Sequence, residues 1–73
     1  MPKLPTLSGK AVCAILKRCG FITVRQKGSH VAMQRQSHET TITVVIPMHD
    51  EIKKGTLLSI IRQSRMSRSE FGG

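Results

Sequence analysis

Apolar residues near the start of the chain recur with the spacing of one helix face. The stripe occupies positions i, i+3, i+4 and i+7, namely Val12, Ile15, Leu16 and Cys19. Ser8 precedes the stripe and belongs to the residue types that cap helix N-termini. Gly20 follows it, where helices commonly end in a left-handed residue. The pattern therefore predicts a helix between Ser8 and Gly20.

Three segments in the middle of the chain have the β-branched or alternating character of strands: Phe21–Gln26, His30–Arg35 and Thr40–Ile46. Turn-forming residues separate them, Lys27-Gly28-Ser29 in the first gap and Gln36–Glu39 in the second. The third segment alternates, with one face made of Ile42, Val44 and Ile46 and the other of Thr41, Thr43 and Val45. Pro47 should stop it.

A second helix is predicted from about Gly55 to Ser64, with four residues available for the core, Leu57, Leu58, Ile60 and Ile61. Beyond it, Ser67 and Glu70 fit the Ser-x-x-Glu capping box, which predicts a last short helical turn ending near Phe71.

The predicted order is α-β-β-β-α, an α+β fold in which two helices cover one face of a three-stranded antiparallel sheet and leave the other face free. This is the layout of a double-stranded-RNA-binding domain. We expect the 73 residues to form a single domain, 1–73, with an extended arm over 1–7, held out of helix by Pro2 and Pro5, and a frayed tail at 72–73.

The net charge of the chain indicates what kind of partner this fold would bind. Twelve Lys and Arg against four Asp and Glu give a formal net charge of +8, which favours a polyanionic partner, most commonly nucleic acid. The plainer alternative is a solvated basic surface. We expect no membrane association, since no apolar run approaches the ~20 residues of a membrane span. The N-terminus also lacks an apolar signal core, so we expect a cytoplasmic location.

The remaining composition argues against metal or thiol chemistry. Cys13 and Cys19 are six residues apart on one helix, too far for a disulfide, and we interpret them as reduced residues in a reducing compartment. The cysteines and histidines lack zinc spacing, and the four carboxylates are scattered. We therefore expect no metal and no cofactor.

His30 is the strongest candidate for acid–base chemistry. It follows the Gly28-Ser29 turn, where glycine lets a phosphate approach closely, and Arg25 and Lys27 stand just before it. Cleavage of RNA by its own 2′-hydroxyl requires a base, an acid and positive charge around the crowded phosphorus. His30 could serve as the base or as the acid, and Arg25 and Lys27 could supply the positive charge. A histidine at a strand start is more often an ordinary polar edge residue.

Two further basic groups have a functional and a plain interpretation. His49, after Pro47-Met48, could transfer a second proton or hold RNA, or could simply hydrogen-bond within its loop. Lys53 and Lys54 precede a helix N-terminus, where phosphate binding is favoured, but helix-flanking charge is equally common. His38 lies in a polar turn and is interpreted as solvated.

A series of motifs, in order along the chain, resembles the HicA toxins, the YcfA-like partners of HicB antitoxins. The resemblance covers roughly residues 7–71. It begins at Leu7-Ser8-Gly9-Lys10, centres on Gly28-Ser29-His30, continues with Pro47-Met48-His49 and Lys53-Lys54-Gly55-Thr56-Leu57, and closes with Met66 through Phe71.

The resemblance implies an mRNA-cleaving endoribonuclease toxin that inhibits translation, with His30 as its catalytic histidine. It also implies a HicB-type antitoxin that covers the active face, and a larger complex in which the antitoxin binds operator DNA. We expect phosphate contacts from seven residues: Lys10, Arg25, Lys27, Gly28, Ser29, Lys53 and Lys54.

Two other function classes stay open from the residues alone. One is an RNA-binding module that grips RNA without cutting it, and the other is a small structural protein of a ribonucleoprotein particle. The scarcity of aromatic residues, Phe21 and Phe71 only, predicts weak base stacking and low sequence selectivity.

Overall fold

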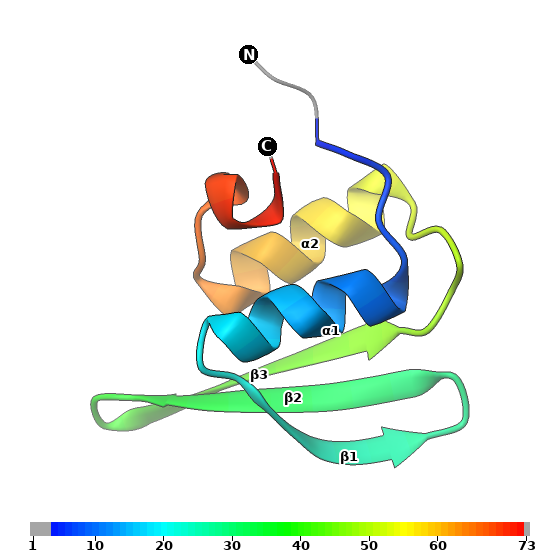
Figure 1. Ribbon diagram of the computed structural model, residues 1–73. Coiled ribbons are helices and arrows are strands. Elements are labelled where there is room, and N and C mark those ends of the chain that lie inside the picture. Colours follow the sequence, from blue (N-terminus) through cyan, green and yellow to red (C-terminus); the bar gives the residue numbers. More distant parts are fainter. Residues whose placement is uncertain (1–3, 73) are drawn as a thin grey trace.

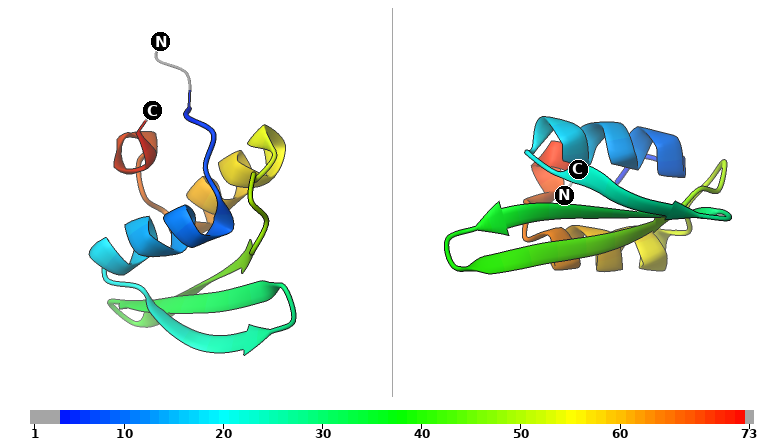
Figure 2. Two further views of the ribbon diagram at one scale, coloured as in Figure 1. Left: turned by 45° about the vertical axis from the view of Figure 1, so that its right-hand side comes forward. Right: turned by 90° about the horizontal axis from the view of Figure 1, so that it is seen from below.

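The structure is a computed structural model that describes residues 4–72. Its elements follow the order α1 (Gly9–Arg18), β1 (Ile22–Lys27), β2 (His30–Ser37), β3 (Thr40–Pro47), α2 (Lys54–Ser64) and a 3-10 turn, η1 (Arg68–Phe71). Both α-helices lie on the same side of the sheet, as Figures 1 and 2 show. The α+β class and the α-β-β-β-α order, with the arrangement of a double-stranded-RNA-binding domain, are confirmed. The first three residues of the expected arm lie outside the described residues.

The start and end of α1 agree with the pattern that predicted them. The Ser8 hydroxyl accepts a hydrogen bond from the Ala11 N–H at 3.1 Å, and Gly20 follows the helix with φ of 98°. The buried face is wider than the predicted stripe, because Cys13 is buried beside Val12 and Leu16. Two residues of the stripe, Ile15 and Cys19, are only partly buried.

The sheet has the order β1-β2-β3 with both pairs antiparallel. β2 and β3 pair without interruption from His30–Pro47 to Ser37–Thr40, so both strands are longer than predicted. The connecting turn is therefore not Gln36–Glu39 but the two residues His38 and Glu39, with His38 at φ of 54°. The strand β3 was predicted to end at Ile46, before Pro47, but it includes Pro47 as its last residue. A proline is tolerated there because β3 is an edge strand.

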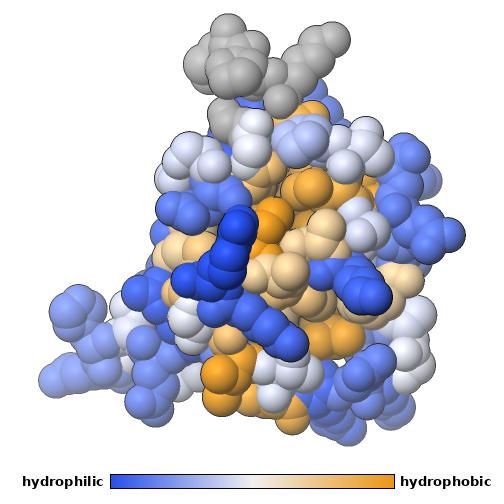
Figure 3. All heavy atoms as spheres, in the orientation of Figure 1, coloured by the Kyte–Doolittle hydropathy of each residue, from blue (hydrophilic) through white to orange (hydrophobic). Residues whose placement is uncertain are grey.

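The core lies between the helices and one face of the sheet. The sheet contributes the inward-facing residues Val31, Met33, Ile42, Val44 and Ile46, all at most 5% exposed. Alternation along β2 and β3 produces this face, as predicted for β3. In the view of Figure 1, hydrophobic side chains gather over the middle of the helical layer and hydrophilic ones surround them (Figure 3).

The second helical region departs from prediction in two places. Leu58 is 37% exposed, so α2 places only Leu57, Ile60 and Ile61 in the core among its apolar residues. The capping box at Ser67 does not form, because the Ser67 hydroxyl pairs with that of Ser69 at 2.7 Å and makes no cap hydrogen bond. The helical turn itself is present and buries Phe71. Gly72 caps it with φ of 88°, so of the expected tail only Gly73 is left, outside the described residues.

The loop after β3 is tied by backbone hydrogen bonds to three separate parts of the molecule. The Met48 N–H donates to the Ser29 carbonyl, the Gly9 N–H to the His49 carbonyl, and the Ile52 N–H to the Leu7 carbonyl. Gly9 is required for this approach, because a Cβ atom there would collide with the Pro47 backbone. The loop therefore fixes the β1–β2 turn relative to the end of β3.

Candidate active site on the open face of the sheet

A β-bulge in β1 decides which side chains reach the open face. Thr23 pairs with Met33 and Arg25 pairs with Ala32, so Val24 is one extra residue with no partner position on β2. Without the bulge, a regular strand would alternate from Thr23 onward and turn Arg25 and Lys27 toward the helices. The extra residue offsets the two halves of β1, so that Thr23 faces the helices while Arg25 and Lys27, paired with Ala32 and His30, both face the open side.

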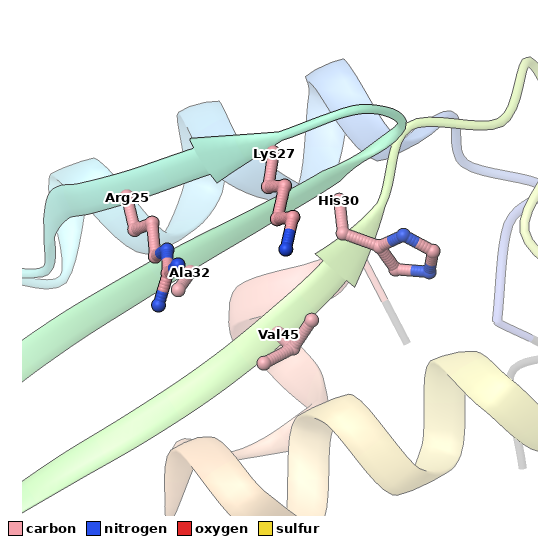
Figure 4. Close-up of a pocket in the computed structure, with 5 residues that line it drawn as sticks. All are labelled: Arg25, Lys27, His30, Ala32 and Val45. Atoms are coloured by element: carbon pink, nitrogen blue, oxygen red, sulfur yellow. The ribbon is translucent and has the colours of Figure 1, made fainter.

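Two cross-strand rows then form on that face. Arg25, Ala32 and Val45 occupy one row, and Lys27, His30 and Pro47 occupy the next. Five of these residues line a hollow of about 300 Å³, namely Arg25, Lys27, His30, Ala32 and Val45. Figure 4 shows the three polar side chains standing on the same side of the sheet.

His30 is exposed at the first position of β2, where its imidazole is accessible to a large substrate. The turn beside it consists of Gly28 and Ser29, and Gly28 has φ of 58°, a conformation that favours glycine. The predicted grouping of His30 with Arg25, Lys27, Gly28 and Ser29 is thus present in space. An imidazole beside two cations can exchange a proton next to a bound anion.

The other predicted site residues lie elsewhere. Lys10 lines a hollow between α1 and the covered side of β1, together with Lys17 and Gln26. Lys53 and Lys54 line a hollow against the arm, at the start of α2. His49 is exposed in the loop after β3, with its backbone carbonyl bonded to Gly9. The basic residues therefore form separate groups.

Two lining residues of the His30 hollow, Ala32 and Val45, were not among the predicted site residues. The alternation of β3 did place Val45 on the outer face, and it is 50% exposed. An apolar residue that faces outward beside predicted cations was the signal that could have identified it.

Burial raises the pKa of both thiols. Desolvation is the main cause for Cys13, partly opposed by Lys17. For Cys19, desolvation is followed by the Glu70 carboxylate, which accepts a hydrogen bond from the thiol at 3.8 Å. Both residues are free thiols and remain protonated at neutral pH, which makes them poor nucleophiles.

Within residues 4–72, no three His, Cys, Asp or Glu side chains are grouped so that they could hold a metal ion. In the same part of the chain, no helix is long and apolar enough to cross a membrane.

The fold and the open face together define a class: a small α+β protein of double-stranded-RNA-binding type whose uncovered sheet surface carries cations around a histidine. The model of a protein family described as the HicA toxin of bacterial toxin–antitoxin systems matches residues 9–66. The chain therefore belongs to the HicA toxin family and is a toxin of a toxin–antitoxin system, with an antitoxin as its general partner. No match was found among curated proteins.

Proposed function

We propose that this toxin is an endoribonuclease that cleaves mRNA on the open face of its sheet, with His30 as the catalytic residue. The observation that carries the proposal is the convergence of Arg25, Lys27 and His30 on one hollow. Two cations and one imidazole are the groups that phosphodiester cleavage by a neighbouring 2′-hydroxyl requires.

In the proposed reaction the neutral imidazole of His30 accepts the proton of the RNA 2′-hydroxyl. The 2′-oxygen then forms a bond to phosphorus, and the bond from phosphorus to the 5′-oxygen of the next nucleotide breaks. The leaving 5′-oxygen takes a proton from a second acid, for which His49 is our candidate. The products are a 2′,3′-cyclic phosphate and a 5′-hydroxyl. Arg25 and Lys27 stabilise the charge that develops on the phosphoryl oxygens, and the step is metal-independent.

The remaining predicted phosphate contacts extend RNA binding beyond this centre. The turn residues Gly28 and Ser29 lie beside His30, and Lys53 and Lys54 stand at the N-terminus of α2, whose dipole favours phosphate. Lys10 lies on the opposite side of β1. A HicB-type antitoxin of acidic character would compete with RNA for this +8 chain. The antitoxin would also carry the complex to operator DNA.

The test compares wild type with His30→Ala on a defined single-stranded RNA, without metal and with EDTA. We expect the variant to cleave roughly 10²–10⁴-fold more slowly, with a 2′,3′-cyclic phosphate as the wild-type product. Binding of a non-cleavable 2′-deoxy oligonucleotide should be nearly unchanged. The matched control is His38→Asn, an exposed histidine on the distant turn, where asparagine tolerates the positive φ. Equal cleavage by wild type and His30→Ala refutes the catalytic assignment.

A second candidate function is RNA binding without cleavage. The hollow of Lys10, Lys17 and Gln26 favours it, because this basic surface is separate from His30. This function predicts no cleavage by wild type or by His30→Ala, and an affinity for RNA that falls as the salt concentration rises.

A further inference from the structure

The open face contains an apolar strip inside its basic surroundings. Ala32 and Val45 are direct partners in the β2–β3 register and line the hollow that contains His30. Val45 is half exposed on a chain that buries the neighbouring valine, Val44, completely. A half-exposed β-branched residue is common on a strand, and what distinguishes Val45 is the set of groups around it.

The strip is bounded on both sides by groups that can hydrogen-bond. On one side lie Lys27 and His30. Lys27 is two residues from Arg25 along β1, and His30 is two residues from Ala32 along β2. On the other side lie Gln34 and Thr43, the next outward pair, whose side chains share a hydrogen bond of 3.2 Å from Nε2 to Oγ1. The Arg25 guanidinium closes the strip at β1 (Figure 4). An apolar floor with polar rims is the usual construction of a small-ligand site.

A nucleobase matches this construction. Its flat faces are apolar, its edges are polar, and it is attached to a phosphate that the neighbouring cations would hold. Arginine also stacks on planar rings, which would place the Arg25 guanidinium against the face of a base. A hollow of about 300 Å³ that is continuous with His30 leaves the base next to the reacting phosphate.

We infer that Ala32 and Val45 form the floor of a nucleobase subsite, which holds one base that flanks the scissile phosphate. The inference rests on the proposed function in taking RNA as the substrate. It adds that binding there depends on apolar contact with the base, and that Gln34 and Thr43 are placed to contact the base edge. Val45 accordingly contacts the substrate and orients it, and takes no part in proton transfer.

The test uses DNA oligonucleotides with a single ribonucleotide, so that only one phosphodiester bond has a neighbouring 2′-hydroxyl. Three substrates are compared: one with all bases, one with hydrogen replacing the base on the 5′ side of that bond, and one with the same change on the 3′ side. We expect wild type to lose roughly tenfold in kcat/KM on one of the two base-free substrates, and the side identifies the base.

Val45→Thr keeps the β-branched shape and replaces a methyl group with a hydroxyl. It should remove most of the difference in kcat/KM between the complete substrate and the affected base-free substrate. The kcat/KM on that base-free substrate itself should be unchanged. The matched control is Thr41→Val, on the same face of β3 but facing a different hollow. Equal discrimination by wild type and Val45→Thr overturns the subsite, even where cleavage still depends on His30.

Binding of fully 2′-deoxy oligonucleotides separates this inference from the proposed function. If wild type cleaves nothing, but binds the complete strand more tightly than the base-free strand in a Val45-dependent manner, the subsite stands and the nuclease assignment fails. If removal of either base leaves both cleavage and binding unchanged, the subsite is refuted.

Discussion

The two faces of the sheet are built from alternate residues of the same strands, yet they have opposite properties. On the covered face, Met33 and Val44 are fully buried against the helices. On the open face, His30 and Val45 are accessible. Stability and the proposed chemistry are thus carried by neighbouring positions in sequence. Substitutions one residue apart should therefore change different properties of the protein.

Deletion of Gln26 should disrupt this comparison most strongly. Lys27 stays opposite His30 across the turn, and the shortened strand can pair regularly back to Thr23 only if Arg25 moves opposite Val31, on the covered face. We expect RNA cleavage to fall about 100-fold or more, because His30 loses one of its two neighbouring cations. Circular dichroism and thermal unfolding should show a folded protein. Deletion of Val24 is the control, because it also shortens β1 by one residue but keeps Arg25 opposite Ala32 and Lys27 opposite His30, and it should retain most activity.

Val44 and Val45 allow the covered and open faces to be compared with the same residue type. Val44→Ala removes fully buried methyl groups and should lower the free energy of unfolding by about 2 kcal/mol. Val45→Ala, at 50% exposure, should lower it by less than about 0.5 kcal/mol. Urea unfolding measures both. Similar losses would show that the open face is also part of the core.

Substitution of single cations should show which side of β1 contacts RNA. If Lys27 holds a phosphate, Lys27→Ala should weaken binding of non-cleavable RNA similarly for all sequences. It should also reduce the slope of log K against log salt concentration by about one. The same change at Lys17, behind β1, tests whether RNA passes around the edge strand. Fluorescence anisotropy over a salt series gives both slopes. An unchanged slope for Lys27→Ala removes it from the phosphate path.

The smallest predicted effect concerns Cys19, away from both faces. The Glu70 carboxylate raises the pKa of this thiol, second to burial. Glu70→Gln removes the charge, so the pKa should fall and alkylation by iodoacetamide at pH 8 should quicken a few-fold. Mass spectrometry follows the rate. Cys13, whose raised pKa comes from burial, is the internal control and should react at its wild-type rate.

Most of the fold follows from periodicity that is visible in the sequence. The Ser8 cap, the Gly20 end and the alternation of Ile42, Val44 and Ile46 are local signals, and the structure confirms them. Leu58 was misplaced because a short helix with four apolar residues does not show which of them tertiary packing will leave out. The capping box does not form because the Ser67 hydroxyl hydrogen-bonds to the hydroxyl of Ser69 instead.

The candidate site was only partly predictable. The sequence brings Arg25, Lys27 and His30 together across a short turn, and the structure places them around one hollow. The bulge at Val24 could not be predicted, because a β-branched residue between Thr23 and Arg25 looks like any regular strand position. Its presence is determined by pairing with β2. Separation of Lys10, Lys53 and Lys54 into other hollows likewise depends on tertiary packing.

The bulge also has a genetic consequence. Single-nucleotide substitutions in the codons of β1 change which side chain is presented but not the face on which it stands. Loss of the Gln26 codon keeps the reading frame, absorbs the bulge and moves Arg25 to the covered face, whereas loss of the Val24 codon removes only the bulge. One in-frame deletion could therefore silence the toxin while sparing its fold, and insertion of one codon at the same place could restore it.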